Sequence, residues 1–427
     1  MATAMVIGAQ WGDEGKGKIV DYLAAKADVV VRSQGGNNAG HTVVTGGKAY
    51  PLRLMPSGIM YPDTVCIVGT GVVIDPKSLL EEMNTLKAQG VDPSNLQIST
   101  RAHVVFPYHI RLDEAEEARK GNRKIGTTKN GIGPCYADKI NRIGIRICDL
   151  MDKDVFAEKL KYNVEVKNML LERLYGVEGF DYEQMLKDYL GYAEQLRPYV
   201  CDTNHTVHKY IEEGKNVLFE GAQASMLDLD NGTYPYVTSS HPVAGGACVG
   251  AAIGPHLMQN IFGVVKAYST RVGEGPFPTE LNNEIGNTIR EIAHEYGTVT
   301  GRPRRVGWLD ARAVRYAAGL SSFDYLAITR LDVLDGMDEI KICVGYEKDG
   351  QPVEEYPADL KYLEQLTPVY RTFKGWKQDI SGIRKYEELP ENARAYVEAI
   401  SELTGVPIGI VSVGPSREQT IVVKEVF

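Results

Sequence analysis

The sequence lacks the features of a secreted or membrane-spanning chain. Its six cysteines are scattered and include no C-x-x-C pair, so they fit free thiols in a reducing cytosol rather than a disulfide framework. There is no run of about 18 apolar residues, and no charged N-terminal segment leads into an apolar one. We therefore expect a soluble, cytoplasmic protein with no membrane partner.

A positive net charge is also absent. Lys and Arg number 47 against 56 Asp and Glu, which gives a net charge of −9. This balance argues against a nucleic-acid partner, so an anionic substrate must be met by locally placed Arg and Lys. The 427 residues suggest two or three domains by length alone, yet no repeat, low-complexity segment or linker divides them. We expect one large α/β catalytic domain over residues 1–427, with inserted helical and loop subdomains.

A glycine-rich stretch, residues 8–18, is the most informative feature that is present. It lies between an apolar run at 4–7, which predicts a buried strand, and residues 19–25, which have helical spacing. Such a turn directs backbone N–H groups and the positive end of the helix dipole at one spot, which favours phosphate. Glycines let the backbone approach the anion, and Lys16 and Lys18 add mobile positive charge.

This loop differs from a Walker A loop. Six residues separate Gly8 from Gly15-Lys16, and Gly17 stands where a Ser or Thr would bind magnesium. The loop also carries Asp13, and an acid in a phosphate cradle repels its ligand unless it holds a metal or takes a proton. We interpret Asp13 as a chemical residue; the alternative is a surface turn rich in Gly and Asp.

A second glycine-rich loop follows the next predicted strand. The β-branched run at 29–31 leads into residues 34–41, which end in Asn38-Ala39-Gly40-His41. In an open α/β sheet, ligands bind beyond the carboxyl ends of the strands, so Asp13 and His41 should share one crevice. A lone histidine is more often structural, but its place beside a phosphate loop favours a function.

The stretch from Gln10 to Lys18, followed by Asn38-Ala39-Gly40-His41, resembles adenylosuccinate synthetase, and the resemblance continues through the whole chain. Members of that family join IMP and L-aspartate to make adenylosuccinate, a step of AMP biosynthesis, and convert GTP to GDP and phosphate. The resemblance implies that Asp13 takes the N1 proton of IMP while O6 attacks the γ-phosphate, giving 6-phosphoryl-IMP. It also implies that His41 and Lys16 assist this phosphoryl transfer and that Gln223 stabilises charge on O6. The aspartate amine then displaces phosphate.

The resemblance also implies Mg²⁺, held by Asp13 and the Gly40 carbonyl. A metal lowers the basicity of the carboxylate that binds it, so whether Asp13 is also the base stays open. Asp228 and Asp230 lie close together and could suggest a second metal site, but Asp-rich turns are more common.

The loop at 124–134 contains small residues, hydroxyls and cations, which suits a phosphate; the alternative is a flexible surface loop. The resemblance implies that Thr128 binds the IMP phosphate and that Arg142 reaches the IMP site of the neighbouring subunit. It therefore implies a homodimer with shared sites. Gln223, which follows a predicted strand at 217–219, and Thr238 are implied to contact IMP.

A third loop, residues 297–305, contains Arg302, Arg304 and Arg305. Guanidinium groups match carboxylates and phosphates in a bidentate way, so the loop reads as an anion receptor; the alternative is an exposed basic loop. The resemblance implies that this loop closes over aspartate. Pro303 interrupts the arginine run and fixes its own φ, so the closing motion is expected to differ.

Residues 325–332 predict a strand followed by a polar turn, which resembles a guanine-reading motif. A carboxylate at Asp332 accepts from both N1–H and the 2-amino group of guanine, a donor pair that adenine lacks. The family often has Lys where this chain has Arg330. Residues 412–414, after a predicted strand at 407–411, match the second guanine loop of the family.

The implied binding residues are grouped by ligand as follows. For GTP they are Gly12, Asp13, Glu14, Gly15, Lys16, Gly17, Lys18, Gly40, His41, Thr42, Arg304, Arg330, Leu331, Asp332, Ser412, Val413 and Gly414. For IMP they are Asp13, Glu14, Gly15, Lys16, Asn38, Ala39, Gly40, His41, Thr128, Arg142, Gln223, Thr238 and Arg302. For aspartate they are Thr298, Val299, Thr300, Gly301, Arg302, Pro303 and Arg304.

The fold class that we expect is α/β, with a large, mostly parallel central sheet, flanking helices and a P-loop-like loop after the first strand. Further strands are predicted at 66–69, 262–271 and 420–423, and helices at 76–89, 153–175, 182–213 and 387–403. Two other functions stay open on the residues alone: a phosphotransferase acting on a hydroxyl, and a GTP-controlled switch protein.

Overall fold

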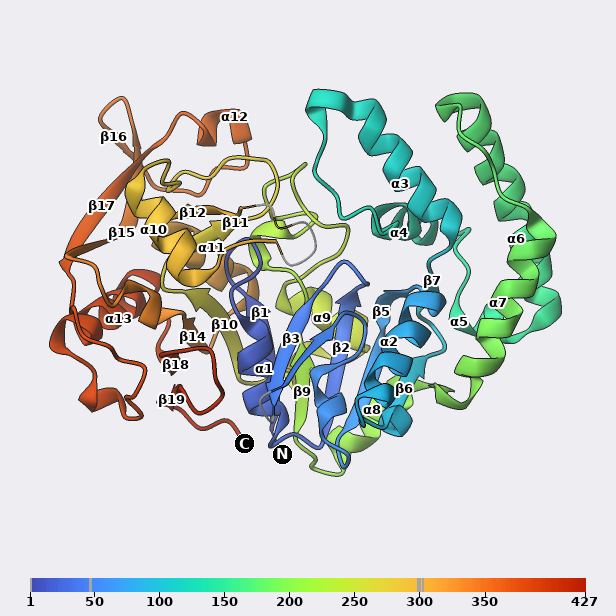
Figure 1. Ribbon diagram of the computed structural model, residues 1–427, viewed down its shortest axis with the longest axis horizontal. Coiled ribbons are helices and arrows are strands. Elements are labelled where there is room, and N and C mark those ends of the chain that lie inside the picture. Colours follow the sequence, from blue (N-terminus) through green and yellow to red (C-terminus); the bar gives the residue numbers. More distant parts are fainter. Residues whose placement is uncertain (1, 46–47, 298–300, 302) are drawn as a thin grey trace.

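The computed structural model describes residues 2–45, 48–297, 301 and 303–427 (Figure 1). A large sheet crosses the molecule, a group of helices lies beyond one end of it, and smaller sheets lie toward the other end. Within the described ranges, no helix is both long and apolar enough to cross a membrane.

The large sheet has 11 strands in the described chain, and β1 lies near its middle. Its strands, in spatial order, are β19 (Thr420–Val422), β18 (Ile408–Ser412), β14 (Tyr325–Thr329), β10 (Ile261–Lys266), β1 (Thr3–Gly8), β9 (Val217–Glu220), β2 (Val29–Gly35), β5 (Val65–Ile74), β6 (Leu96–Ser99) and β8 (Val200–Cys201), with β7 (His103–Val104) paired to β5. All the pairings are parallel except that of β18 with β19. This is the mostly parallel sheet that the sequence predicts.

The strand order reverses beside β1. The chain first moves from β1 to β2, β5, β6 and β8 on one side, then inserts β9 next to β1 and continues through β10, β14 and β18 on the other. The carboxyl ends of these parallel strands meet at one edge of the sheet, and ligands of such sheets bind where the order reverses. The loops after β1, β2, β9, β14 and β18 are therefore the ones to inspect.

Side chains of β1 are buried on both faces, as expected for a central parallel strand. Ala4 and Val6 pack with apolar residues of α1 (Lys16–Ala24) on one face, whereas Met5 and Ile7 pack into the larger cluster on the other. On that second face α9 (Ala244–Ala251) approaches β5 closely: a Cβ at Gly71 would lie 2.7 Å from the Cα of Gly250. The closeness explains why both positions carry glycine.

The helices cover both faces of the sheet and form the lobe beyond β6. Their bounds are α1 Lys16–Ala24, α2 Pro76–Ala88, α3 Pro107–Lys120, α4 Ile132–Ile140, α5 Ile147–Met151, α6 Lys153–Met169, α7 Tyr182–Leu196, α8 Thr203–Glu212, α9 Ala244–Ala251, α10 Glu284–Ala293, α11 Ala311–Ser321, α12 Leu360–Leu363 and α13 Glu391–Thr404. Apolar side chains of α2, α3, α6 and α7 share a second buried cluster with β5 and β6.

Three smaller sheets complete the fold. They are β3 (His41–Thr45) with β4 (Lys48–Leu52); β11 (Ser269–Arg271) with β12 (Arg305–Gly307); and β13 (Leu309–Asp310), β15 (Glu339–Lys348), β16 (Gln351–Val353) and β17 (Thr367–Lys374). The first carries His41 and the second ends next to Arg304, so both small sheets border loops that the sequence singled out.

Three predicted elements differ from the structure. The predicted strand at 262–271 is split, because the chain leaves the large sheet after Lys266 and β11 pairs with β12 instead. The predicted helix at 182–213 is broken: Pro198 cannot continue a helix, and Val200–Cys201 pairs with β6 before α8 begins. The last helix begins at Glu391 rather than 387, since Pro390 restricts Leu389 to extended backbone.

Candidate active site

The phosphate-type loop has the backbone that its glycines predict. Gly12 and Gly15 have φ of 94° and 84°, and α1 begins directly after Gly15. Asp13 between them also has a positive φ, 59°, which is uncommon for a residue with a side chain. The loop therefore turns sharply enough to direct its N–H groups toward one region ahead of α1.

Glu14 shapes this loop from inside. Its side chain is completely buried, and its Oε1 accepts hydrogen bonds from the N–H groups of Gln10 (3.2 Å) and Gly12 (2.8 Å). Its Oε2 lies 2.6 Å from Nζ of Lys16, so the lysine charge is compensated before any ligand binds. Glu14 is thus a structural acid of the loop, in contrast to its neighbour.

Asp13 is more accessible, with a side chain that is 39% exposed. Its Oδ2 lies 2.9 Å from Nε of Arg304, a close ion pair without the alignment of a hydrogen bond. The same guanidinium donates to the buried Glu295 through Nη1 (2.7 Å). The acid of the phosphate loop is therefore adjacent to an arginine of the predicted aspartate loop.

His41 is held by a carboxylate from another strand. Its Nδ1 lies 2.5 Å from Oε1 of Glu220, the last residue of β9, and the N–H of Ser57 donates to Oε2 of the same carboxylate (2.8 Å). A Cβ at Gly17 would lie 3.4 Å from the Cβ of His41, so the histidine packs beside the start of α1. Within the described chain Nε2 has no partner, which leaves that nitrogen for a substrate.

The loops after β2 and β9 are joined by amides. Gln223 donates from Nε2 to Oδ1 of Asn38 (3.1 Å), and Gln34 donates to Oε1 of Gln223 (3.2 Å). Two predicted IMP residues, Asn38 and Gln223, are therefore in direct contact. Thr238 is half-buried, and its N–H donates to the Leu227 carbonyl (2.9 Å).

The guanine-type loops lie beside the phosphate loop. Thr329, the last residue of β14, donates to the Glu14 carbonyl (2.5 Å). Lys18 donates to Oγ of Ser412 (2.6 Å) and to the carbonyls of Gly414 (2.7 Å) and Gln419 (2.9 Å). Burial lowers the pKa of Lys18 to about 8. Lys18 is a fixed cation of this junction, not the mobile charge that the sequence suggests.

Asp332 carries the feature that a base-reading carboxylate needs. Its Oδ1 is buried and has no hydrogen-bond partner among the described residues. Burial raises the pKa of this carboxyl, although the nearby cations of Arg330 and Lys18 favour its charge. A buried acceptor without a partner is costly, so this oxygen is suited to a donor supplied by a ligand.

Four predicted site residues other than glycine share a left-handed backbone: Asp13, Arg142, Gln223 and Arg330 have φ between 58° and 62°. This conformation is unfavourable for residues with a side chain, and it clusters at functional sites. The predicted site thus coincides with strained backbone at Asp13, Gln223 and Arg330, three residues that lie beyond different strands of one sheet.

Other predicted residues are not brought into this group of contacts. Thr128 and Arg142 are exposed, and within the described chain neither forms a hydrogen bond or ion pair with the phosphate loop. Their segment nevertheless approaches the loop after β2, where Asn130 donates to the Asn37 carbonyl (3.3 Å). Gly40 and Thr42 are exposed beside His41, and Ala39 is half-buried.

The aspartate-type loop is described in part. Thr298, Val299, Thr300 and Arg302 lie outside the described residues, whereas Gly301 and Pro303 lie within them, and Pro303 forms a bridge with Tyr296. Arg305 is not available as part of the predicted anion receptor, because its guanidinium is already paired within the protein. It forms a two-pronged ion pair with Glu280 (2.8 and 2.6 Å) and donates to the Gly275 carbonyl (2.7 Å).

Two buried acids of the site were missed by sequence reasoning, Glu220 and Glu295. Glu220 ends the apolar run Val217-Leu218-Phe219, and a charge at the end of a buried strand could have marked it. No local feature of the sequence singles out Glu295 as a buried acid. Its partner Lys266 gives the only hint, since a lysine inside an apolar strand needs a buried counter-charge.

The oxygen atoms near the phosphate loop suit a hard cation that is bound mainly through the phosphates of a nucleotide. No group of three His, Cys, Asp or Glu side chains in the described ranges could hold a metal. Asp13 offers a half-exposed carboxylate, and the exposed residue Gly40 offers a backbone carbonyl. Magnesium typically uses one or two such oxygens together with phosphates and water. Asp228, by contrast, is a turn residue, whose Oδ1 accepts from the N–H groups of Asp230 and Asn231.

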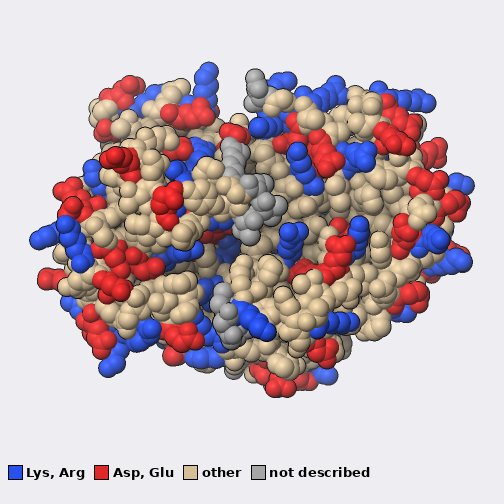
Figure 2. Space-filling view, viewed as in Figure 1, with Lys and Arg blue, Asp and Glu red and all other residues tan. Residues whose placement is uncertain are grey.

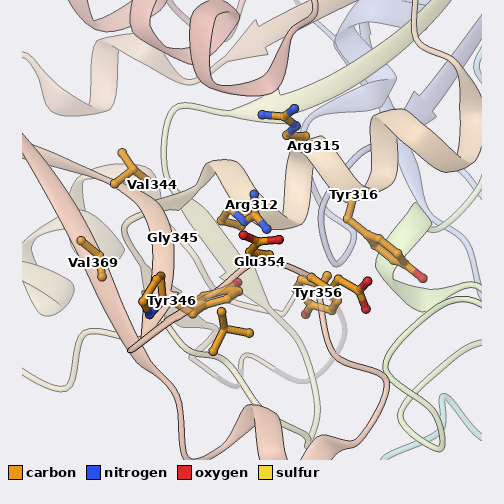
Figure 3. A pocket seen from close by; sticks show the side chains of 12 residues that line it. Arg312, Arg315, Tyr316, Val344, Gly345, Tyr346, Glu354, Tyr356 and Val369 are labelled. Atoms are coloured by element: carbon orange, nitrogen blue, oxygen red, sulfur yellow. The ribbon is translucent and has the colours of Figure 1, made fainter. Parts of the chain in front are cut away.

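The surface offers further context for these loops. In Figure 2 the face shown is hollowed between its left and right halves, on the side where the strands of the large sheet end in Figure 1. A separate cavity of about 810 Å³ lies between α11, β15 and β16 (Figure 3). It is lined by two arginines and two glutamates, and by tyrosines of which Tyr316 and Tyr356 are stacked. None of the predicted site residues lines it.

Comparisons with known proteins agree with the geometry. A family model described as adenylosuccinate synthetase matches residues 5–421. The adenylosuccinate synthetases of Carboxydothermus hydrogenoformans and Geobacillus kaustophilus are 59% and 56% identical to this chain, each over 427 residues and the full length of both proteins. A structure of fully ligated adenylosuccinate synthetase from Plasmodium falciparum superposes with a TM-score of 0.93 at 42% identity, covering 99% of this chain and 100% of that one.

Proposed function

The chain belongs to the adenylosuccinate synthetase family, and we propose that the loops meeting around Gly15–Lys18 form its reaction centre. The reaction is the GTP-dependent ligation of IMP and L-aspartate to adenylosuccinate, with GDP and phosphate as the other products, in AMP biosynthesis. The observation that carries the site proposal is the contact of loops from β1, β2, β9, β14 and β18 at one edge of the sheet.

The chemical difficulty of the reaction lies at C6 of the purine, because O6 is a poor leaving group at neutral pH. Phosphorylation of O6 to 6-phosphoryl-IMP solves it, and the aspartate amine then displaces phosphate. We assign Asp13 to the N1 proton of IMP, which makes O6 more nucleophilic. Its accessible carboxylate and strained backbone support this role, whereas the carboxylate of Glu14 is buried and already bonded within the loop.

His41 and Lys16 act on the transferring phosphoryl group. Since Nδ1 of His41 is engaged by Glu220, its Nε2 is the nitrogen that donates toward the phosphate. Lys16 brings a charge to the start of α1, where the loop N–H groups and the helix dipole also favour anions. Positioning and electrostatic stabilisation supply most of the acceleration of phosphoryl transfers.

The family implies a metal ion, and we propose Mg²⁺ held by Asp13 and the Gly40 carbonyl together with the phosphates. When bound, the ion neutralises negative charge on the nucleotide. A carboxylate shared between a metal and a proton is less basic than a free one, so Asp13 is assigned as essential on either role.

The substrates are assigned to separate loops. Asn38, Gln223, Thr238 and Thr128 face IMP, and Arg142 is supplied by the neighbouring subunit of a homodimer. We assign residues 298–304 to aspartate, and Arg304 also to the phosphates because it lies beside Asp13. Arg330, Asp332 and residues 412–414 hold guanine, a role supported by the unpartnered oxygen of Asp332. We also propose a cytoplasmic location, where nucleotide synthesis takes place.

The test of the reaction is an omission experiment. The protein is incubated with GTP, Mg²⁺, IMP and aspartate, and each component is left out in turn. GDP formation and the change in purine absorbance should require all four. GTP hydrolysis without IMP would favour a switch protein, and a stable phosphorylated product made without aspartate would favour a phosphotransferase.

The test of the site uses two substitutions and one control. Asp13→Ala and His41→Asn should abolish turnover and leave the far-ultraviolet circular dichroism unchanged. His208→Asn is the matched control, because among the described residues the ring of His208 on α8 bonds only the Ala252 carbonyl (2.9 Å), outside the site. A variant of Asp13 or His41 that keeps its rate removes that residue from the mechanism.

A further inference from the structure

A buried cluster of charges lies behind Asp13. Lys266 at the end of β10 and Glu295 after α10 are 1% and 0% exposed, and Tyr268 beside them is 0% exposed. Nζ of Lys266 lies 2.5 Å from Oε1 of Glu295, and it also donates to Oγ1 of Thr270 (2.8 Å). Two opposite charges are thus enclosed in the core, where each needs the other.

The carboxylate of Glu295 serves more partners than Lys266. Its Oε1 also accepts from the hydroxyl of Tyr268 (2.6 Å), and its Oε2 accepts from Nη1 of Arg304 (2.7 Å). Burial alone would raise the pKa of Glu295, but the charge of Lys266 and the hydrogen bonds of all three donors outweigh it and hold this pKa at about 2. The group is therefore a permanent anion in the folded protein.

Glu295 also binds the backbone of Arg304. The N–H of Arg304 donates to the Glu295 carbonyl (2.9 Å), and the bridge between Tyr296 and Pro303 lies one residue inside this contact. The two ends of the predicted aspartate loop are therefore joined at residues 295 and 304. The guanidinium of Arg304, 15% exposed, extends from this joint to Asp13.

We propose that Glu295 is a positioning residue for the ligase reaction, acting through Arg304, whose guanidinium it fixes against Asp13. The inference rests on the proposed function, which assigns Asp13 and Arg304 to the reacting end of the site. An arginine that is free to choose among rotamers would meet the phosphates in only a fraction of molecules. Anchoring one side of the fork to a buried carboxylate removes that freedom before the substrates arrive.

The test is a double-mutant cycle of Glu295→Gln and Arg304→Ala, read as kcat at saturating GTP, IMP and aspartate. In the otherwise unchanged protein, Glu295→Gln should lower kcat by about 10- to 100-fold, since a misplacement of about 1 Å has effects of that size. The KM for IMP should change by less than about 2-fold, since the assigned IMP residues Asn38, Gln223 and Thr238 lie on loops that Glu295 does not contact within the described chain. In the Arg304→Ala background, Glu295→Gln should have almost no further effect on kcat.

Two further variants control the experiment. Glu280→Gln is the matched control, because Glu280 is also a carboxylate paired with an arginine, the adjacent Arg305 (2.8 and 2.6 Å); its kcat should stay within about 2-fold of the parent. Glu295→Gln leaves Lys266 buried without its counter-charge, which threatens folding. The variant Lys266→Met/Glu295→Gln removes both charges, and it should show the same loss of kcat with a cooperative thermal transition.

The outcomes separate the inference from the proposed function. A loss of kcat that is equal with and without Arg304 makes Glu295 a purely structural residue and overturns the inference alone. Full activity of Arg304→Ala overturns the assigned role of Arg304 and the inference with it. Failure of both Glu295 variants to fold also assigns Glu295 to the core and overturns the positioning role.

Discussion

At the scale of single residues, the neighbouring acids Asp13 and Glu14 show how burial divides labour. Both lie in the phosphate loop, yet Glu14 is completely buried and is consumed by two backbone N–H groups and Lys16, whereas Asp13 is 39% exposed beside Arg304. A buried carboxylate with satisfied partners organises structure, and an accessible one can bind a ligand. Two neighbouring acids in the sequence are therefore suited to different tasks.

Asp332 gives a residue-scale prediction about base selection. Asp332→Asn replaces one acceptor oxygen with a donor, so the paired N–H groups of guanine lose a partner worth about 1–3 kcal/mol. The ratio of kcat/KM for GTP to that for ATP should fall by about 5- to 150-fold. The exposed Asp338, changed to Asn, is the control and should leave the ratio unchanged. An unaltered ratio in Asp332→Asn would refute the base-reading role.

Asp310 gives a prediction about pH. It is fully buried at the start of α11, and burial raises the pKa of its carboxyl to about 6 from an ordinary value of 3.8, although Tyr346 and two backbone N–H groups bond it. Between these values the folded state holds the proton more tightly than the unfolded state does. The free energy of unfolding should therefore fall as pH rises from 4 to 7, by about 3 kcal/mol from this group.

The measurement compares urea unfolding of the parent and Asp310→Asn at pH 4.5 and 7.5. Asp310→Asn should be less stable than the parent at both pH values, because its helix cap is altered. However, its free energy of unfolding should fall less between pH 4.5 and pH 7.5 than that of the parent. An equal pH dependence in both proteins would contradict the shift. Glu295, whose pKa is lowered to about 2, acts in the opposite sense: its stabilising contribution is lost only as pH falls below about 4.5.

Individual contacts were the least predictable level. The sequence suggested that Lys18 is a mobile charge and that Arg305 belongs to an anion receptor. In the structure Lys18 is fixed to the loop at 412–419, and Arg305 is paired with Glu280. The local sequence around a lysine in a glycine-rich loop is the same whether the lysine binds a phosphate or a carbonyl from a distant part of the chain. Only the fold brings the partner within reach, so the choice is not visible in the local sequence.

At the scale of elements, one helix holds the loop that we assign to the IMP phosphate. Glu117 on α3 accepts from the N–H groups of Ile125 (3.3 Å), Gly126 (2.8 Å) and Thr127 (3.4 Å). Asp113, one turn earlier, accepts from Oγ1 of Thr127 (2.8 Å) and the N–H of Gly131 (3.1 Å). Two carboxylates on one face of α3 therefore fix a loop with no regular structure of its own.

Removing one of these carboxylates should free the loop. Glu117→Ala loses three acceptor contacts, each worth about 0.5–1.5 kcal/mol, so the KM for IMP should rise by about 10-fold with a smaller change in kcat. Trypsin should also cut faster after Lys124 and Lys129. Glu114→Ala, an exposed position on the same helix, is the control and should change neither measurement. An IMP KM within 2-fold of the parent would show that α3 does not order the loop.

Elements were predicted best where the pattern was local and strong. The apolar and β-branched runs of β1, β2, β9, β14 and β18 identified strands, and their parallel pairing is confirmed. The break between α7 and α8 was missed, since Val200–Cys201 forms a strand only because β6 offers an edge. The sheet of β15, β16 and β17 was not predicted at all, although β15 is a ten-residue strand.

At the scale of the whole molecule, the symmetry of the proposed homodimer can be tested by mixing. Arg142→Leu and Asp13→Ala should each be inactive alone. In a heterodimer, one site carries both changes and the other carries neither, because Arg142 is supplied by the opposite subunit. Random exchange at equal concentrations should therefore restore about one quarter of the parent activity.

The control mixes Asp13→Ala with His41→Asn. Both residues belong to the site of one chain, so every site in the heterodimer keeps one defect and no activity should return. Recovery in this control, or its absence in the first mixture after exchange has been confirmed by labelled subunits, would contradict shared sites.

The large-scale architecture of the chain could be predicted from its sequence, whereas its assembly stays a prediction. A mostly parallel sheet follows from alternating strands and helices, and a full-length family match supports the same conclusion. The division of the chain into one domain with inserted subdomains stays a prediction, as does the homodimer. Both depend on contacts between surfaces, which the pattern of a single sequence does not encode.

The bond from Lys18 to Ser412, Gly414 and Gln419 has a consequence for how the protein is made. The lysine leaves the ribosome early, but its acceptors lie 394 to 401 residues further along the chain. Strand β1 also cannot pair with its neighbours until later in translation, since β9 and β10 begin at Val217 and Ile261. A nascent chain therefore cannot assemble its phosphate-type loop during translation of the first half, and a product that stops before residue 412 lacks all three acceptors of Lys18.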